Sequence, residues 1–479
     1  MSKNKLSKKL LALSAALTLG LAQGAWAVEA EATPEAAAQV ESQVVSLNLQ
    51  EAMVRAFNTN PAIEIAGYER ASAKADLDAA RSSRWLSVKG ESRFGRGGAD
   101  HEVIREFTFL DNSTGTPQIN KVPINVGKQI SETYTNNLSA SMPIYTGGRL
   151  SGTVKAAKAG FKYALEGEQK AYNDMRATVT SGYYGLLQAG NMQELGRESV
   201  HRLEEHLKDV RAQYDVGVVA KVDVLRSEVE LANAQQNLIK AENAYQLAEA
   251  NLNRIVGLPL HTQLALEETL KYVPYAETME ACLDYASNNR PELEQARQGI
   301  EAARGSLLVA RSGYQPQIGV SATKSWENDE WFADENGKWG VGVGVSMNIF
   351  DSGVTMSKIH GAKANLAKAE AVYRDTTDAV MLHVRQSYLN LREAEKRIQT
   401  TQVAVAKAEE DFHIAQVRYM AGVGTNTDVL DAEVALTNAK TNYSQSLYDY
   451  NISKTDLQNA IGEPMAFPRN VTVEAAAEK

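Results

Sequence analysis

The sequence predicts a mainly α-helical protein with a membrane β-barrel part, built from two copies of one structural unit. The first observation is an internal duplication of about 200 residues: QYDVGVVAKVDVL at Gln213–Leu225 returns as RYMAGVGTNTDVL at Arg418–Leu430. The second is a pair of proline-free stretches, Leu150–Val216 and Val354–Ala421, with the residue spacing of very long helices. The third is alternation of apolar and small residues before each of these stretches, which is typical of β-strands.

The amino terminus has the pattern of a secretory signal peptide over residues 1–27, with an early cluster of lysines, an apolar run and the sequence AWA before Val28. Residues 28–46 are rich in Ala, Glu and Gln and are predicted to be a disordered leader. The remaining chain has no run of 18 or more apolar residues, so no membrane-spanning helix is expected. The exported protein should therefore be periplasmic or cross the outer membrane through β-strands, which presupposes a Gram-negative cell.

Composition excludes several classes of function. The chain has 50 basic and 59 acidic residues and a net charge of −9, which argues against a nucleic-acid partner. Its single cysteine, Cys282, excludes an internal disulfide and thiolate metal clusters. We expect Cys282 to be a buried small hydrophobic residue.

The duplication divides the rest of the chain into a first structural repeat, a connector, a second structural repeat and a C-terminal tail, at residues 47–260, 261–278, 279–465 and 466–479. Each repeat opens with helical sequence, at Leu49–Ser83 and Met279–Gly313, interrupted before Pro61 or Pro291. The distance from that proline to the long helix is about 25 residues greater in the first repeat. The irregular stretch Gly95–Lys128 is therefore predicted to be an insertion, with DNSTGTP as a turn.

Each repeat supplies two strands of about ten residues, long enough to cross a membrane when tilted. They are expected at residues 85–95 and 133–145 in the first repeat and at 316–326 and 339–350 in the second. The clearest is Trp339–Ile349, WGVGVGVSMNI, where large apolar residues alternate with Gly, Ser and Asn. A half-buried soluble sheet shows the same alternation, but the chain has no other apolar mass that could cover one.

The segment Arg418–Glu433 is predicted to turn one long helix back on itself. On both sides of it large apolar residues recur every seven positions, the a/d seam of a coiled coil: Leu391, Ile398, Val405, Phe412 and Tyr419 before it, and Leu436, Tyr443, Tyr450 and Leu457 after it. Gly422 and Gly424 break the helix, and Thr427 with Asp428 is expected to cap the returning helix. The two hairpin tips therefore fall at residues 214–223 and 419–428, and the preceding helices should be about 100 Å long.

Four strands are too few to close a barrel, and an open sheet edge in hydrocarbon leaves backbone N–H and C=O groups unpaired. Several copies of the chain must therefore share one sheet. Two copies would give eight strands and an interior filled by side chains, whereas three would give twelve strands and a lumen. The long helices would continue such a barrel as a hollow tube.

These features resemble the TolC-like family of outer-membrane efflux and secretion channels. The resemblance covers Leu47 to Pro464 and rests on the doubled order of elements, on YxxG followed by DVL in both tips, and on GLP and GEP at the ends of the two halves. It implies a homotrimer with a twelve-strand β-barrel in outer-membrane lipid, continued by a long α-helical coiled-coil barrel in the periplasm. It also implies a passive exit duct of a tripartite efflux or type I secretion system, with a periplasmic adaptor protein and an inner-membrane pump of the RND, ABC or MFS type.

The same resemblance assigns roles to residues of the tips. Asp428 and Asp431 would form the pore constriction, and Tyr419 and Asp223 would latch the second hairpin to the first. At the position of the family's latching arginine this chain has Gly424, so its closed state should be held differently. The residues facing the adaptor would be Val216, Gly217, Val218, Ala421, Gly422 and Val423.

The residues do not point to an enzyme. His201 and His206 in HRLEEH lie five positions apart, which places them about 140° apart around a helix, so we expect solvated histidines rather than a zinc site. The sequence contains no nucleophile elbow, phosphate-binding loop or dinucleotide fingerprint, and no cofactor is expected. The alternative to a channel is a soluble periplasmic coiled-coil scaffold or adaptor-like binding protein. The exported substrate is not indicated by the residues.

Overall fold

A computed structural model describes residues 44–98, 104–111, 113, 115, 117–125, 130–328 and 337–463. The predicted signal peptide, residues 28–43 of the predicted leader and the predicted tail lie outside the described residues. From Ser46 onward the described residues form one compact unit.

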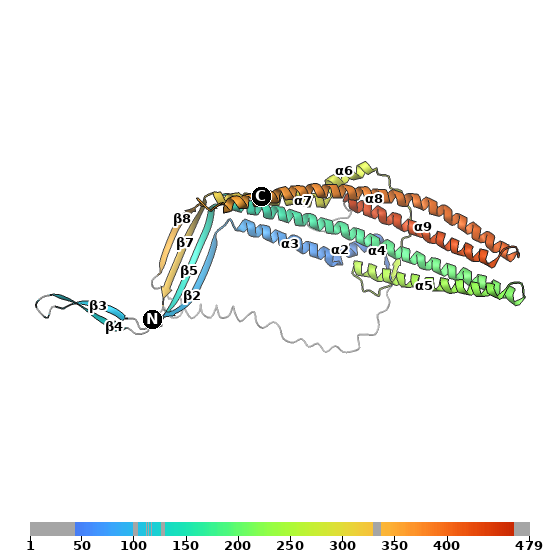
Figure 1. Ribbon diagram of the computed structural model, residues 1–479, viewed down its shortest axis with the longest axis horizontal. Coiled ribbons are helices and arrows are strands. Elements are labelled where there is room, and N and C mark those ends of the chain that lie inside the picture. The colour runs from blue at the N-terminus through green and yellow to red at the C-terminus, as the bar shows by residue number, and fades with distance from the viewer. Residues whose placement is uncertain are drawn as a thin grey trace. The chain divides into compact units, whose positions relative to one another are not determined.

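The two halves of the chain run through the same order of elements (Figure 1). The described helices are α2 (Leu49–Thr59), α3 (Pro61–Ser82), α4 (Arg149–Asp215), α5 (Lys221–Val256), α6 (Met279–Asn289), α7 (Pro291–Arg311), the short 3₁₀ helix η1 (Ser312–Tyr314), α8 (Val354–Met420) and α9 (Asn426–Ile461). The described strands are β1 (Val45–Leu47), β2 (Ser87–Gly98), β3 (Ile104–Asp111), β4 (Gln118–Asn125), β5 (Ile130–Tyr145), β6 (Leu264–Leu266), β7 (Gln317–Asn328) and β8 (Lys338–Ser346). Helices α4 and α8 have 67 residues each, and the returning helices α5 and α9 have 36 each.

Strand β1 begins inside the range predicted as leader. It pairs with β6, Leu47 is buried, and the hydroxyl of Tyr183 donates a hydrogen bond to the Leu47 carbonyl. Composition predicted no structure for Val45 and Ser46, because the pairing that orders them comes from the distant connector.

Four strands form one antiparallel sheet in the order β2-β5-β7-β8. The central pair β5–β7 joins the two halves of the chain, and β2 and β8 are the edges. On β8 the large apolar side chains Trp339, Val341, Val343 and Val345 are all exposed. Strand β8 ends at Ser346 rather than near residue 350, because Ser346 pairs with Gln317, the first residue of β7, and later residues have no facing strand.

The insertion in the first repeat contains a strand pair that the sequence reading missed. Strands β3 and β4 pair antiparallel, with Phe107 opposite Val122. Of the predicted DNSTGTP turn, Asp111 is the last residue of β3, and residues 112, 114 and 116 lie outside the described residues. The stretch was predicted to be irregular because Arg105 and Glu106 obscure the alternation. In the structure Glu106 forms an ion pair with Lys121 across the strands.

The long helices pack side by side in the part of the molecule that Figure 1 shows away from the sheet. Helix α4 packs against α5 on one side and α9 on the other, and α8 packs against α9. Within the α8–α9 pair Leu391, Ile398, Tyr450 and Leu457 of the predicted seam are buried in one cluster, whereas Val405, Phe412 and Tyr443 are partly buried. Helices α5 and α8 therefore lie at the two edges of the layer formed by α5, α4, α9 and α8.

Nearer the sheet, the shorter helices replace the returning ones. Helix α3 continues along α4 beyond the end of α5, and α7 lies between α4 and α8. At the junction the side-chain amide of Asn60 donates to the carbonyl of Ile255 at 3.0 Å, which satisfies a carbonyl at the carboxyl end of α5. In the second half Arg290 donates in the same way to the carbonyl of Asn459 in α9.

None of the helices in the described ranges is both long and apolar enough to cross a membrane.

Candidate functional site at the helical tips

The two hairpin tips have the same backbone geometry. Gly217 and Gly422 adopt positive φ angles of 80° and 76°, a conformation that favours glycine. The N–H of Gly422 donates to the carbonyl of Tyr419, and the N–H of Val423 donates to that of Arg418, both at 3.0 Å. Gly217 and Val218 make the equivalent pair of bonds. This is the Schellman arrangement, so the glycines are required to end α4 and α8.

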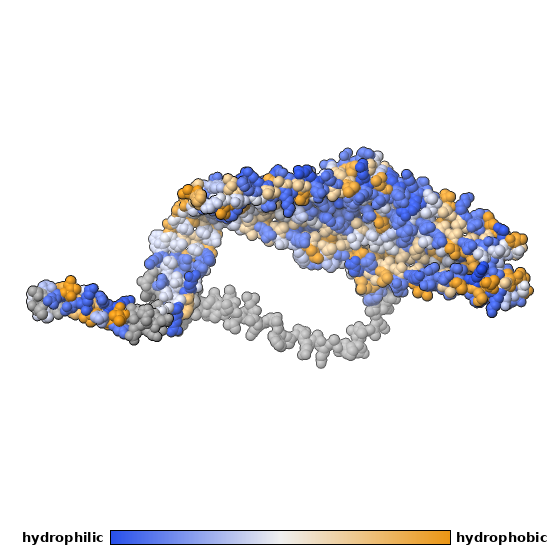
Figure 2. Space-filling view, in the orientation of Figure 1, coloured by the Kyte–Doolittle hydropathy of each residue, from blue (hydrophilic) through white to orange (hydrophobic). Residues whose placement is uncertain are grey.

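Both tips present apolar side chains to solvent. Val216, Val218 and Val423 are 75%, 71% and 68% exposed, and Gly217, Ala421 and Gly422 are exposed beside them. Met420, which the sequence reading did not single out, is exposed as well. Figure 2 shows apolar surface at the ends of both hairpins. A partner could therefore bury apolar area at both tips.

The cap of α9 differs from the expected one. Thr425, not Thr427, is the N-cap residue: its hydroxyl accepts from the N–H of Asp428 at 3.1 Å, and Asp428 Oδ2 accepts from the N–H of Thr425 at 2.9 Å. This capping box lowers the pKa of Asp428, and the largest cause is the hydrogen bond from the Thr425 backbone N–H. Thr427 instead accepts a hydrogen bond from Arg226 of α5. Asp428 and Asp431 are both exposed, on the same side of the first turns of α9.

Tyr419 lies between the two hairpins. Its ring is buried against His206 of α4, with ring centroids 5.2 Å apart, and it belongs to a cluster with Val210 and Val429. Burial raises the pKa of Tyr419, and the charge of Asp223 raises it further. Its hydroxyl has no hydrogen-bond partner among the described residues. The structure thus brings Tyr419 close to the first hairpin by packing rather than by a hydrogen bond.

Gly424 remains within its own turn. Its N–H donates to the carbonyl of Arg418 at 3.0 Å, and a Cβ at this position would lie 3.0 Å from the Tyr419 nitrogen.

A buried polar cluster at the tips was missed by sequence reasoning. Asn426 is 3% exposed, and its Oδ1 lies 2.7 Å from His206 Nε2 and 3.2 Å from the hydroxyl of Ser227. Its Nδ2 donates to the carbonyl of Asp223 at 3.1 Å. We call His206, Ser227 and Asn426 the tip cluster. The expectation of solvated histidines is therefore correct for His201, which is exposed, but wrong for His206.

A second polar layer lies farther from the tip. Glu433 of α9 is 2% exposed and accepts hydrogen bonds from Arg202 through both carboxylate oxygens, at 2.8 and 3.1 Å. Ser199 and Thr437 each donate to Glu433 at 3.0 Å. Asn426, Glu433 and Lys440 recur every seven residues beside the seam, and this polar stripe is the signal that could have revealed the α4–α9 contact.

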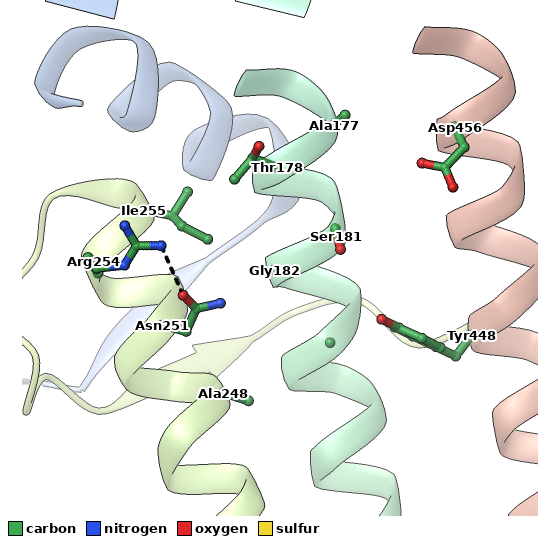
Figure 3. A pocket seen from close by; sticks show the side chains of 11 residues that line it. Ala177, Thr178, Ser181, Gly182, Ala248, Asn251, Arg254, Ile255, Tyr448 and Asp456 are labelled. Carbon is green, nitrogen blue, oxygen red and sulfur yellow. Dashed lines mark hydrogen bonds between the residues drawn. The ribbon is translucent and has the colours of Figure 1, made fainter. Parts of the chain in front are cut away.

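A cavity of about 510 Å³ lies between α4, α5 and α9, roughly 45 Å along α4 from the tip (Figure 3). Small residues of α4 line one side, and a Cβ on Gly182 would lie 2.9 Å from Ile255 of α5. Burial raises the pKa of Asp456, which faces the cavity from α9. In the described ranges no group of three or more His, Cys, Asp or Glu side chains could hold a metal ion.

Comparison with known proteins identifies the family. The sequence model described as "Outer membrane efflux protein" matches residues 52–258 and 282–463, which is most of the chain. The chain belongs to the outer membrane efflux protein family. Membership places it in the outer membrane, with its helical part in the periplasm, and agrees with the expectation that it is not an enzyme, since members of this family are channels.

Individual relatives are distant. The chain is 24% identical to the alkaline protease secretion protein AprF of Pseudomonas aeruginosa over 396 residues, covering 76% of this chain and 80% of that protein. It is 24% identical to the outer membrane protein TolC of Escherichia coli over 297 residues, so the match spans only 60% of TolC and 59% of this chain. The crystal structure of the CmeC outer membrane channel of Campylobacter jejuni superimposes with a TM-score of 0.73 at 17% identity, covering 86% of this chain and 85% of that one. This likeness confirms the predicted fold class.

Proposed function

We propose that the chain is the outer-membrane channel of a tripartite efflux or type I secretion system, a passive exit duct formed by three copies. In this proposal the duct works with a periplasmic adaptor and an inner-membrane pump and is gated at the helical tips. Relatives named for secretion and for efflux both align with the chain. The observation that carries the proposal is that, among the described residues, the sheet and the helical layer of one copy both end in edges without a neighbouring strand or helix.

The edge helices carry apolar side chains that the described part of the chain leaves exposed. On α5 Leu225, Val229 and Leu247 are about half exposed or more, and on α8 the same is true of Leu389 and Val403. Both edges are thus suited to a neighbour, and an α5 edge that packs against the α8 edge of the next copy generates a ring. Exposed apolar stripes of this kind are costly in water unless a partner covers them.

The sheet supports the same closure. Strands β2 and β8 each have one neighbour among the described strands. Open edges are costly in hydrocarbon, so β8 of one copy would pair with β2 of the next. Three copies of the four-stranded sheet give twelve strands, enough for a lumen. The lipid would contact the exposed Trp339 and Val side chains of β8.

The tips would form the entrance. Three copies place six carboxylates, from Asp428 and Asp431, around one axis, a field that favours cations. Tyr419, packed against His206 and Val210 of the first hairpin, would hold the second hairpin against the first, with Asp223 as its partner in the latch. The exposed apolar residues 216–218 and 421–423 would contact the adaptor, as they are the apolar surface at the ends of the hairpins.

The oligomer is tested by one substitution at an edge helix. We expect Val229→Asp on α5 to reduce the trimer fraction of purified protein, measured by size-exclusion chromatography with light scattering, because it places a charge in the contact between copies. Val434→Asp is the matched control, since Val434 is 47% exposed on α9, which lies within the layer. Equal effects of the two changes would contradict the proposed edge contact.

The channel itself is tested in planar lipid bilayers. The purified protein is expected to conduct ions weakly when closed, and more after Asp428 and Asp431 are both changed to Ala. The absence of conductance for both proteins would overturn the proposed function.

A further inference from the structure

We propose that Asn426, held by His206 and Ser227, is the lock that keeps the two hairpins of one copy together at the entrance, and that acidification releases it. The inference rests on the proposed channel function and assigns the regulation of its entrance. Asn426 would be a positioning residue, since it acts on the entrance by holding α9.

Hydrogen bonding determines the orientation of the Asn426 side chain. Its Nδ2 donates to the Asp223 carbonyl, so its Oδ1 is the acceptor for the other two partners. His206 must therefore donate to it through Nε2–H at 2.7 Å. The single hydroxyl proton of Ser227 is shared between Asn426 Oδ1, at 3.2 Å, and the Asp223 carbonyl, at 3.0 Å. One amide thus links α9 to both helices of the first hairpin.

The position of Asn426 couples this lock to the entrance. It is the first residue of α9 and follows the N-cap Thr425. Asp428 and Asp431 lie on the same first turns, so a movement of Asn426 away from α4 and α5 moves both carboxylates. Away from the tip the α8–α9 seam does not depend on the lock, because its buried residues there belong to those two helices and the α6–α7 segment. At the tip, separation of the second hairpin also exposes Tyr419, which packs in one cluster with Val210 of α4.

Every helix packed around His206 contributes to its environment. Asp209 lies nearby on α4, and Glu433 faces His206 from α9, where Arg202 neutralises its charge. The Ser227 hydroxyl lies on the α5 side, and the Tyr419 ring packs against His206 from α8. Burial lowers the pKa of His206, and this outweighs the opposing effects of the Asn426 hydrogen bond, Asp209 and Glu433. The buried imidazole is therefore neutral in the closed tip at neutral pH.

The direction of the pH effect follows by linkage. In the separated state His206 is solvated and its pKa returns toward 6.5. The closed state thus binds fewer protons than the open one. The contribution of the lock is complete above about pH 6.5 and is lost as the pH falls below that value, so acid favours opening.

The experiment measures open probability of the full-length channel in planar bilayers from pH 8 to pH 5. We expect Asn426→Ala to raise open probability about tenfold or more at pH 7.5, since it removes hydrogen bonds that join the hairpins. We expect His206→Gln, which keeps a donor but cannot titrate, to flatten the pH profile. His201→Gln, on the same helix but exposed, should retain the wild-type profile.

A second readout does not depend on conduction. Spin labels on Val218→Cys and Val423→Cys, one on each tip, report the distance between the hairpins. The native Cys282 is buried and should not label. The distance distribution is expected to widen at pH 5.5 in the labelled protein that keeps His206, and to widen in the Asn426→Ala variant. It should not widen at pH 5.5 in the labelled protein that carries His206→Gln.

The two readouts separate the two hypotheses. If the wild type conducts but Asn426→Ala opens no more than it does, or His206→Gln keeps the wild-type pH profile, the lock is wrong. If no variant conducts while the label distance still widens with acid, the lock stands and the channel function fails.

Discussion

The guanidinium of Arg202 and the carboxylate of Glu433 form a two-point ion pair between α4 and α9, with Glu433 almost completely buried. Removing one partner of such a pair leaves a buried charge uncompensated. We expect Arg202→Ala to cost about 3 kcal/mol of stability, the lower end of the usual range because the Arg202 side chain is 20% exposed.

The measurement is the thermal unfolding midpoint of the purified protein. The double variant Arg202→Leu, Glu433→Leu is the control, and it should lose less than Arg202→Ala because no charge remains buried. A larger loss in the double variant would contradict an uncompensated charge as the cause.

Helices α4 and α7 approach each other closely where Gly152 of α4 meets Gly305 of α7. A Cβ on Gly305 would lie 2.7 Å from both the Ala156 nitrogen and the Gly152 carbonyl oxygen. Gly305→Ala is therefore expected to lower stability by about 1–3 kcal/mol, through steric overlap. Gly299→Ala, also on α7 but with open space at its Cβ, should be neutral or stabilise by up to about 1 kcal/mol through helix propensity. Equal midpoints for the two variants in thermal unfolding would refute the close approach.

Asp428 has two separable roles, as a cap and as an entrance carboxylate. Thr425→Ala removes the hydroxyl that caps α9 but keeps the carboxylate, whereas Asp428→Asn removes the charge. We expect Asp428→Asn to reduce cation selectivity in bilayers, and Thr425→Ala to increase hydrogen exchange at the start of α9 with little change in selectivity. Because hydrogen bonds lower the pKa of Asp428, its charge should persist as the pH falls to about 3.8 and below.

The connector is fastened to the second hairpin by a pair that should release in acid. Glu395 accepts a 2.6 Å hydrogen bond from the Tyr272 hydroxyl and forms an ion pair with Arg392. Both contacts lower the pKa of Glu395, and the hydrogen bond from Tyr272 has the larger effect. The contribution is present above pH 4.5 and is lost as the pH falls through the lowered value.

Tyr272→Phe should therefore make the connector more sensitive to limited proteolysis at neutral pH, as acid does in the wild type. Tyr285→Phe, on the nearby helix α6, is the matched control. Unchanged cleavage of Tyr272→Phe relative to this control would show that the hydroxyl does not hold the connector.

Cys282 should resist thiol reagents in the folded protein. It is 2% exposed, and burial raises the pKa of its thiol, although a contact with Tyr275 opposes this. We expect alkylation at pH 8 to be slow in the native state and fast in denaturant. Rapid native labelling, followed by mass spectrometry, would mean that α6 opens from the α8–α9 pair.

Much of this architecture could be read from residue patterns. The seven-residue spacing of Leu391, Ile398 and their counterparts on α9 predicts the hairpin, because apolar residues at that spacing lie along one side of each helix and pack against the partner helix. The alternation at β7 and β8 predicts strands, because successive side chains of a strand point to opposite faces of the sheet. The β3–β4 pair was missed because its alternation is interrupted by charges.

The polar contacts at the tips were not predictable in this way. His206 and Asn426 are 220 positions apart, and a lone histidine or asparagine on a helix has no pattern that names its partner. The family resemblance suggested Tyr419, Asp223 and Gly424 instead. Of these, the structure packs Tyr419 against the first hairpin and keeps Gly424 within its turn.

The sequence by itself determined the duplicated helices, the four strands of the larger sheet and the two hairpin tips, because each is specified by the local pattern of side chains. Only the tertiary structure decided that α4 meets α9 through buried polar groups, that His206 is enclosed, and that α5 and α8 are left as edges. These depend on which faces of separate helices meet, and hence on burial and hydrogen-bond geometry across long stretches of chain.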